Sequence, residues 1–470
     1  MTASLERFFT CDLEDCELPS VRGFGPCERC NLHHCLSHSN PPSHTCDNKP
    51  LPDDAFEANV HTEVKNLRAK INDEAVCQRA SELNGNVKCE IEHPPPWGRG
   101  ALMGWANYHA RIRFESGAVW LMRVPRTNGS LPQSLIDYLV RSEYATLKFL
   151  ESTQVPAPRV YDYAISEEPD NKIGVSYILM EEMPGRPWNQ QGSPGKETAD
   201  KEDKEKIWSG LADILIELER YPFPKGGSLL PGSSGSCLEP VVGALASERF
   251  LVLSPAGPYD TAKEYYASFM EQNMVLIADG QLFTSFPVNA YLIFLYLKSQ
   301  ISTLTATTTL DDEPAEASEK FYIKHVDDKG DHIMVDDDLN IVGIIDWQMA
   351  RVVPANEAFG PSLVTAEMSD IYDGISSLTE QDQALARLLR EKGAGHLADI
   401  MSKDEKLRRF FFGLDVEFPW EETLLLIRGI WTAFGLGKDT EWKTWKIEML
   451  ERYAEDERLK GMIEKFGVGP

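Results

Sequence analysis

The sequence predicts an α+β protein in which a small metal-stabilised module precedes a sheet-rich segment and then a mainly helical one. Three observations favour this order. Six of the nine cysteines lie in the first 46 residues. Alternating apolar patterns, typical of strands, occur within residues 105–182, and the rest of the chain shows mainly helical periodicity interrupted by polar loops.

Length and composition limit the classes of function. The 470 residues suffice for two or three domains, and 42% hydrophobic and 26% charged residues are ordinary for a globular protein. The formal net charge of -27 and the lack of a Lys/Arg block predict no nucleic-acid partner. The start lacks the apolar core of a signal peptide, and the longest apolar run, 290–297, is too short to cross a bilayer. We therefore expect a cytoplasmic or nuclear protein without membrane contact.

The N-terminal segment contains eight candidate metal ligands in four close pairs. They are Cys11 and Cys16, Cys27 and Cys30, Cys35 and His38, and His44 and Cys46. Thiolates and imidazoles at this density suit two tetrahedral zinc ions, and in a reducing compartment a metal site is expected before disulfides. The segment has almost nothing to bury, so it needs metal to fold. His33 and His34 fall outside the spacing and are expected to be solvated.

This ligand order resembles the AN-one-type zinc finger, a double-zinc module often found in stress-associated and ubiquitin-linked proteins. The resemblance implies one ion held by Cys11, Cys16, Cys35 and His38, and another held by Cys27, Cys30, His44 and Cys46. Both ions would be structural. We therefore expect residues 1–50 to bind a protein partner, with ubiquitin-linked proteins as the class that the resemblance suggests. The alternative is a disordered Cys-rich tail.

The elements of the body follow from its local patterns. Residues 47–56 are predicted to be a linker and 57–84 to be helical. The sheet-rich segment is expected to hold a β-hairpin, an amphipathic helix and two strands, at 105–126, 132–151, 160–165 and 176–182. Three polar segments should interrupt the helical remainder: a charged insertion at 189–206 and loops at 225–236 and 302–319.

The most informative segment is 321–351. Two short apolar strands, 333–335 and 341–345, flank a turn and predict a hairpin that ends at Asp346. Such a hairpin can bring the loop that carries Asp327 close to Asp346. Phosphoryl transfer needs one carboxylate to orient or deprotonate the attacking hydroxyl, and another to hold magnesium against the phosphates. The two aspartates supply one of each.

The sequences His325-Val326-Asp327 and Ile345-Asp346-Trp347 resemble the catalytic loop and the metal-binding motif of the aminoglycoside phosphotransferase and choline kinase group, relatives of protein kinases. Residues 325–336 are most similar in sequence to fungal members of this group. The resemblance implies that Asp327 is the catalytic base, that His325 braces its loop, and that Asp346 is the main magnesium ligand. His332 stands where the family has a metal-binding Asn. The expected ion is magnesium or manganese. Because imidazole suits softer metals than magnesium, three alternatives stay open: His332 acts through a bound water, the site favours manganese, or it holds a single metal ion.

The same resemblance implies a two-lobed kinase-like fold, with a linker and helix at 51–95, a sheet-rich small lobe at 96–185 and a helical large lobe at 186–470. Arg123 would replace the family's phosphate-binding Lys, with Glu143 as its partner, although the two alone are equally compatible with a surface ion pair. The loop of residues 104–108 would cover ATP or GTP, and 180–183 would be the hinge that faces the base. The implied nucleotide-binding residues are thus Arg123, Glu143, Gly104, Asn107, Met180, Glu181 and Met183.

These features favour a kinase that moves the γ-phosphate of ATP or GTP to a hydroxyl of a small-molecule acceptor. The acidic composition is compatible with a cationic acceptor, such as an aminoglycoside or an amino alcohol. A second hypothesis is a pseudokinase scaffold, favoured by His332 and by the glycine-poor loop. A third is a metal hydrolase built on His325, Asp327, His332 and Asp346.

Overall fold

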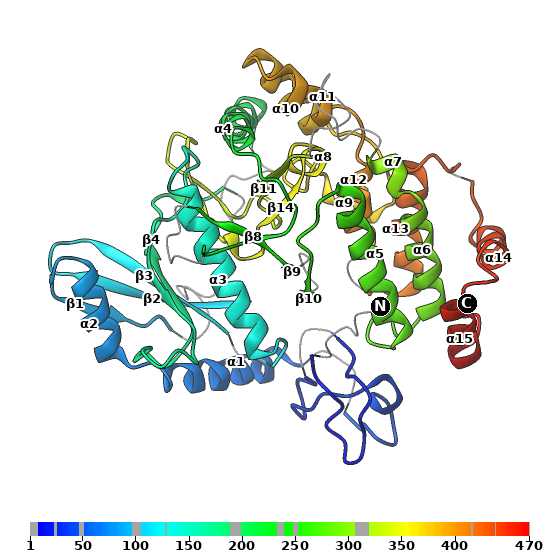
Figure 1. The fold of residues 1–470 in the computed structure, drawn as a ribbon, viewed down its shortest axis with the longest axis horizontal. Helices are drawn as coiled ribbons and strands as arrows, with labels where there is room; N and C mark the ends of the chain where they lie inside the picture. The colour runs from blue at the N-terminus through cyan, green and yellow to red at the C-terminus, as the bar shows by residue number, and fades with distance from the viewer. Residues whose placement is uncertain are drawn as a thin grey trace.

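The chain was studied as a computed structural model, and its structure is described over most of its length. The described residues are 8–22, 26–46, 51–95, 104, 106–126, 129–188, 199–232, 239–247, 252–305, 319–414, 417–437 and 439–469. A sheet-rich lobe and a helical lobe lie side by side, and the N-terminal module lies below and between them in Figure 1. Among the described helices, none combines the length and the apolar character needed to span a membrane.

The small lobe is built on an antiparallel sheet of five strands in the order β1-β2-β3-β5-β4. The strands are β1 (Cys89–Glu92), β2 (Asn107–Phe114), β3 (Val119–Pro125), β4 (Val160–Ala164) and β5 (Tyr177–Glu181). Successive side chains of a strand point to opposite faces. Tyr108 and Ala110 therefore join the cluster on one face, while Ile178 and Met180 join the main core on the other.

Two helices cover the first face, and one covers the second. α1 (Asp53–Arg68) and α2 (Asp73–Leu83) contribute Val60, Val64 and Val76 to the cluster that holds Tyr108. α3 (Gln133–Leu150) packs with its apolar stripe, including Leu147 and Leu150, against the main core. The predicted hairpin, helix and two later strands are thus found within a few residues of their expected positions.

Two expectations about the small lobe differ from the structure. Residues 51–95 form no separate linker, because α1, α2 and β1 are packed into the lobe, and α1 begins at Asp53. The lobe therefore starts well before residue 96. In the charged segment at 189–206, residues 189–198 lie outside the described part, and α4 begins at Lys201.

The connection between the lobes runs beside the predicted hairpin. After β5 the chain enters β6 (Arg186–Pro187), which pairs with β12 (Ile333–Val335), and β12 pairs with β13 (Ile341–Ile344). Gly185 makes this passage possible, because its φ is +86° and an added Cβ would lie 2.4 Å from the Val335 carbonyl oxygen. The hinge is therefore fixed directly against the strands that lead to Asp346.

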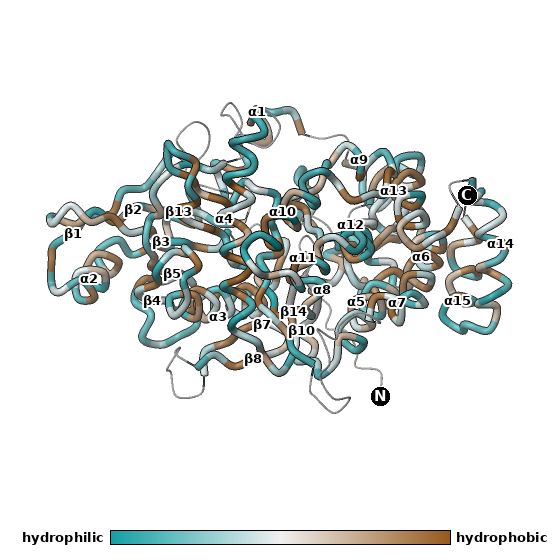
Figure 2. Tube along the Cα trace, turned by 90° about the horizontal axis from the view of Figure 1, so that it is seen from above, coloured by the Kyte–Doolittle hydropathy of each residue, from teal (hydrophilic) through white to brown (hydrophobic). Residues whose placement is uncertain are grey.

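The large lobe consists mainly of helices around one apolar core. Its helices are α4 (Lys201–Glu219), α5 (Ala262–Ala278), α6 (Pro287–Ser299), α7 (Ile301–Thr305), α8 (Ala355–Ala358), α9 (Met368–Tyr372), α10 (Glu380–Glu391), α11 (Gly395–Met401), α12 (Lys406–Phe412), α13 (Trp420–Ala433), α14 (Trp442–Arg452) and α15 (Glu457–Phe466). Residues 287–297 of α6 are all buried, as expected for a helix that is apolar on every side. In Figure 2, hydrophobic stretches gather in the interior, whereas α1 at the rim is largely hydrophilic.

Short strands and 3-10 turns complete the lobe and the module. They are β7 (Ser228–Leu230), β8 (Val241–Gly243), β9 (Leu245–Ser247), β10 (Val252–Ala256), β11 (Phe321–Lys324), β14 (Arg351–Pro354), η1 (Leu36–His38) and η2 (Trp347–Met349). β11 and β14 pair on either side of the segment that contains Asp327 and Asp346. Both aspartates therefore lie in loops whose ends are held by one ladder.

Candidate functional site

Asp346 is held in an unusual backbone conformation at the end of the hairpin. Its φ of 63° and ψ of 57° are left-handed, a region that costs free energy for a residue with a side chain and is often found at functional sites. The Ile345 N–H donates to the His332 carbonyl oxygen at 3.0 Å. His325 Nε2 donates to the Ile345 carbonyl oxygen at 2.9 Å. These bonds fix the backbone immediately before Asp346, and His325 acts here through its bond to the loop.

Arg123 connects the small lobe to Asp346. Its Nη2 donates to Asp346 Oδ1 at 2.5 Å, and its Nε donates to Glu143 Oε2 at 3.0 Å. The side chains of Arg123 and Glu143 are only 5% and 3% exposed, which excludes an ordinary surface ion pair. Burial alone would raise the pKa of Asp346, but the neighbouring Arg123 guanidinium holds that pKa well below its usual range. Asp346 is therefore an anion at neutral pH, as a cation ligand must be.

A buried amide strengthens the link between the lobes. Gln348 Oε1 accepts from Asn107 Nδ2 at 2.7 Å and from Arg123 Nη2 at 3.4 Å. Asn107 is 3% exposed and belongs to β2, so the structure does not place it in a free loop over a nucleotide. This differs from the expectation for residues 104–108. Gly104 is exposed and its N–H donates to the Asn107 carbonyl oxygen, while Trp105 lies outside the described residues.

The other expected nucleotide contacts lie at the hinge. Met180 is 4% exposed and belongs to the main core, so it is not presented to a cleft. Glu181 Oε2 accepts from the Arg159 N–H at 3.2 Å. Met183 is half-buried and packs on Gly343 of β13, where an added Cβ would lie 2.7 Å from Met183 Cε. Met183 thus directly contacts the hairpin that leads to Asp346.

Asp327 lies in a loop that His332 ties to Asp346. The Asp327 side chain is 26% exposed, with Oδ1 at 3.5 Å from Lys329 Nζ. His332 Nδ1 donates to the Asp327 carbonyl oxygen at 2.9 Å, so in the neutral imidazole the lone pair is on Nε2. That Nε2 is 3.5 Å from Asp346 Oδ2. Asp327 is thus accessible to a reactant. An oxygen of Asp346 and a nitrogen of His332 face one another.

The pair of Asp346 and His332 suits a divalent cation. Magnesium usually takes one or two protein ligands and completes its shell with phosphate oxygens and water, whereas an imidazole nitrogen is better suited to manganese or zinc. A neutral His332 Nε2 and Asp346 Oδ2 both carry lone pairs, and a shared cation would satisfy both. Within the described part of the chain, groups of three or more closely spaced ligand atoms occur only in the N-terminal module. Two protein ligands are therefore what the chain offers here.

Lys329 and Gln348 were not predicted from the sequence. Lys329 Nζ lies between Asp327 and Asp331, at 3.1 Å from Asp331 Oδ2, and its side chain is 37% exposed. A cation beside the candidate base can neutralise charge on a transferred phosphoryl group. Its position two residues after Asp327 is the signal that could have identified it. Gln348, two residues after Asp346, offers the same kind of signal.

The two expected sets of zinc ligands are each brought together. In the first set, His38 Nδ1 lies 3.5 Å from Cys11 Sγ and 3.4 Å from Cys35 Sγ, and Cys16 and Cys35 sulfurs are 3.8 Å apart. In the second, His44 Nε2 lies 3.3 Å from Cys27 Sγ and 3.7 Å from Cys30 Sγ. The edge of a tetrahedral zinc–thiolate site is about 3.8 Å. Within each set of four residues, all ligand atoms lie within 4.8 Å of one another, so both sets fit a tetrahedral ion.

His33 and His34 are not solvated, in contrast to the expectation. His33 Nε2 donates to the Gly129 carbonyl oxygen at 2.9 Å, and the His33 ring stacks on Phe9. The His34 ring is half-buried at 4.2 Å from the His44 ring. His34 Nε2 also lies 3.6 Å from Cys30 Sγ, four residues away. The His33 contact could not be expected from local spacing, because Gly129 is 96 residues away in the sequence.

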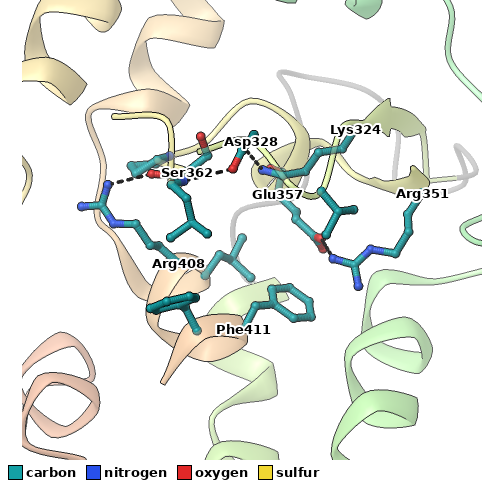
Figure 3. A pocket seen from close by; sticks show the side chains of 12 residues that line it. Lys324, Asp328, Arg351, Glu357, Ser362, Arg408 and Phe411 are labelled. Atoms are coloured by element: carbon teal, nitrogen blue, oxygen red, sulfur yellow. Dashed lines mark hydrogen bonds and ion pairs between the residues drawn. The ribbon is translucent and has the colours of Figure 1, made fainter. Parts of the chain in front are cut away.

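A cavity of about 60 Å³ lies against the loop that carries Asp327. Val326 and Asp328, its neighbours in sequence, both line the cavity, and α12 forms the opposite wall through Phe411 and Arg408 (Figure 3). The charges that line it are balanced. Asp328 is 4.0 Å from Lys324, Glu357 is 3.1 Å from Arg351, and Arg408 is 3.1 Å from Asp382 and 2.6 Å from Glu405.

A sheet-rich lobe and a helical lobe joined by a hinge, with a buried Arg–Glu pair aimed at a hairpin aspartate, define a phosphotransferase of the protein-kinase-like class. The family is identified by a match of the sequence. Residues 99–360, more than half of the chain, match the phosphotransferase enzyme family, and the chain belongs to that family.

Solved structures of low identity cover most of the chain. A Ralstonia eutropha protein assigned as an aminoglycoside phosphotransferase is 13% identical over 84% of this chain and 99% of its own, with a TM-score of 0.41. Macrolide 2'-phosphotransferase MphH from Brachybacterium faecium is 14% identical over 78% and 99%, with a TM-score of 0.37. Plasmodium vivax ethanolamine kinase is 12% identical over 77% and 81%, with a TM-score of 0.39. At these values the matches add nothing to the family assignment. No curated protein has significant sequence similarity to the chain.

Proposed function

We propose that the protein is a small-molecule kinase that moves the γ-phosphate of ATP or GTP to a hydroxyl of its acceptor. The observation that carries the proposal is the contact of Arg123 with both Glu143 and Asp346. The proposal takes Arg123 as a cation for phosphate oxygens and Asp346 beside it as an ionised carboxylate for a metal, at the junction of the lobes.

The roles of the individual side chains follow from their positions. Asp327, which is accessible, accepts the proton of the acceptor hydroxyl, and Lys329 beside it stabilises negative charge on the phosphoryl group. Glu143 keeps the Arg123 guanidinium oriented while its Nη groups bind phosphate. Asp346, with His332, holds a magnesium or manganese ion, which when bound neutralises the charge of the nucleotide phosphates.

The cavity between the Asp327 loop and α12, at about 60 Å³, has room for only a small apolar part of an acceptor. Each carboxylate that lines the cavity already lies beside a cation, so its lining attracts no polycation. Apolar side chains such as Val326, Leu363 and Phe411 contribute much of the remaining wall. We therefore expect a compact acceptor with an apolar part and little net charge. An aminoglycoside, which the acidic composition alone allows, does not fit this lining.

We further propose that the two Cys/His clusters hold structural zinc. Each has three thiols and one imidazole, which is a common donor set of closed zinc sites. The described part of the module buries almost no apolar side chain other than Cys11 and Cys35, so the ions take the place of a hydrophobic core.

Nucleotide titration by calorimetry tests the proposed kinase function. ATP and GTP should each be titrated with magnesium and with manganese into the wild type, Asp346→Asn and the exposed-turn control Asp337→Asn. We expect metal-dependent binding that Asp346→Asn weakens by at least about tenfold and that Asp337→Asn retains. A folded wild-type chain that binds neither nucleotide would contradict the proposal and favour the scaffold hypothesis.

A further inference from the structure

The N-terminal module (residues 8–46) contacts the large lobe at the turn between α5 and α6. The Arg22 N–H donates to the Gln281 carbonyl oxygen at 2.8 Å, and Arg22 Nε donates to Gln281 Oε1 at 3.0 Å. Gln281 is 2% exposed. Leu36 packs on Gly280, where an added Cβ would lie 3.2 Å from Leu36 Cδ2. A main-chain bond, a side-chain bond and an apolar contact therefore join the module to this turn.

The same module contacts the small lobe from its other side, as its position in Figure 1 suggests. His33 Nε2 donates to the carbonyl oxygen of Gly129, a few residues before α3 begins. Pro26 packs on Gly129, with its Cδ 3.1 Å from the position of an added Cβ. Asn59 of α1 donates from Nδ2 to the Glu28 carbonyl oxygen at 2.8 Å. The module thus bridges the two lobes.

One apolar cluster connects the module to the candidate active site. Phe8 of the module and Met349 of η2 both pack against the cluster of Leu135 and Leu139 on α3. The Arg22 guanidinium lies over the Phe8 ring at 3.7 Å, which joins this cluster to the contact with the large lobe. α3 carries Glu143, and η2 begins directly after Asp346. Phe8 therefore packs against α3, which carries Glu143, in the cluster that also receives Met349 from the element after Asp346.

We propose that the N-terminal module is an internal brace that sets the geometry of Arg123, Glu143 and Asp346, and that its metal content thereby controls nucleotide affinity. A module that owes its shape to bound ions is rigid only when they are present. A rigid bridge lowers the entropy lost when the lobes close on a nucleotide. The brace uses the module in cis, whereas the partner-binding role suggested by the zinc-finger resemblance needs a surface that faces outward.

Two variants of the full chain test the brace without touching a zinc ligand. Phe8→Ala removes the apolar contact with α3. Arg22→Ala removes the side-chain bond to Gln281 and the guanidinium over Phe8, and leaves the main-chain bond in place. Leu32→Ala is the matched control, because Leu32 belongs to the module and its side chain is 39% exposed. For each protein we would measure zinc content, amide hydrogen exchange in peptides covering 129–139 and 345–349, and the Kd for magnesium–ATP.

We expect both variants to keep the zinc content of the wild type, to exchange faster in the two peptides, and to weaken nucleotide binding by about five- to tenfold. Removing zinc from the wild type with a chelator should reproduce both effects, and Leu32→Ala should match the wild type. Unchanged exchange in Phe8→Ala and Arg22→Ala would overturn the brace, as would an equal effect of Leu32→Ala.

The nucleotide readout rests on the proposed kinase function, but the exchange readout does not. A chain that binds no nucleotide yet shows faster exchange in both variants would contradict the kinase proposal and support the brace. Normal nucleotide binding with unchanged exchange would support the kinase proposal and overturn the brace.

Discussion

Arg123 and Asp346 form an ion pair of 2.5 Å between Nη2 and Oδ1, although 223 positions separate them in the sequence. One residue is on β3 of the small lobe and the other follows β13 of the large lobe. Glu143 holds the same guanidinium from α3. The site is therefore assembled from three elements: β3, α3 and the residues that follow β13.

Replacing Arg123 should lower the free energy of unfolding, because it leaves a buried carboxylate without its partner. Arg123→Met leaves Glu143 buried without its cation, and we expect a loss of about 3 kcal/mol in the free energy of unfolding. Arg123→Met combined with Glu143→Gln should recover much of that loss, because the charge is removed together with its partner. Both proteins should bind magnesium–ATP weakly. Denaturant unfolding measures the first effect and calorimetry the second. Equal destabilisation by the single and double variants would contradict the buried pair.

His332→Asn should change the preferred metal ion. Asparagine offers an oxygen in place of the imidazole nitrogen, and magnesium prefers oxygen ligands. We expect the ratio of the ATP dissociation constants measured with magnesium and with manganese to fall in the variant. His61→Asn, at an exposed position of α1, is the control. An unchanged ratio would show that His332 does not contact the ion.

The local patterns of the sequence predicted much of the body, but contacts between distant segments could not be predicted. The hairpin of β2 and β3 and the helix α3 have clear periodicity. β1 was missed because its four residues, Cys89–Glu92, include two charged ones and read as a polar connection. The burial of Asn107 depends on Gln348, 241 positions away, and no local signal reports it.

The N-terminal module also combines what the sequence predicted with what it could not. The spacing of its ligands and the family resemblance predicted two sets of four residues, and each set is brought together. The contacts of His33 with Gly129 and of Arg22 with Gln281 depend on the docking of the module against the body. Because this docking follows from tertiary packing, it could only be found in the structure.

The zinc proposal predicts a stoichiometry. Elemental analysis of the purified chain should find two zinc ions per molecule. Cys35→Ser should lower the content to about one, since it removes one thiolate from the first cluster only. Cys77→Ser is the control, because Cys77 belongs to α2 and lies outside both clusters. Two ions retained by Cys35→Ser would contradict the assignment of that ligand.

Filling the cavity beside the Asp327 loop should block acceptor binding alone. Leu363→Trp replaces a branched side chain that lines the cavity with a larger indole ring. We expect the rate of phosphate transfer to fall at least about tenfold while the Kd for magnesium–ATP is unchanged. Ile447→Trp adds the same ring at a position of α14 that is 57% exposed and should have no effect. Small uncharged aliphatic alcohols and an aminoglycoside should be compared as acceptors. Preferred turnover of the aminoglycoside would contradict the assignment of a charge-balanced cavity.

The most direct test of the account is phosphate transfer by Asp327→Asn. The wild type, Asp327→Asn and the exposed-turn control Asp337→Asn would be incubated with γ-labelled ATP, magnesium or manganese, and a panel of small alcohols, and labelled product would be measured. We predict transfer in the wild type and in the control, and a loss of at least about a hundredfold in Asp327→Asn with the Kd for ATP unchanged. Transfer that persists at the wild-type rate in Asp327→Asn would contradict Asp327 as the base and with it the proposed mechanism.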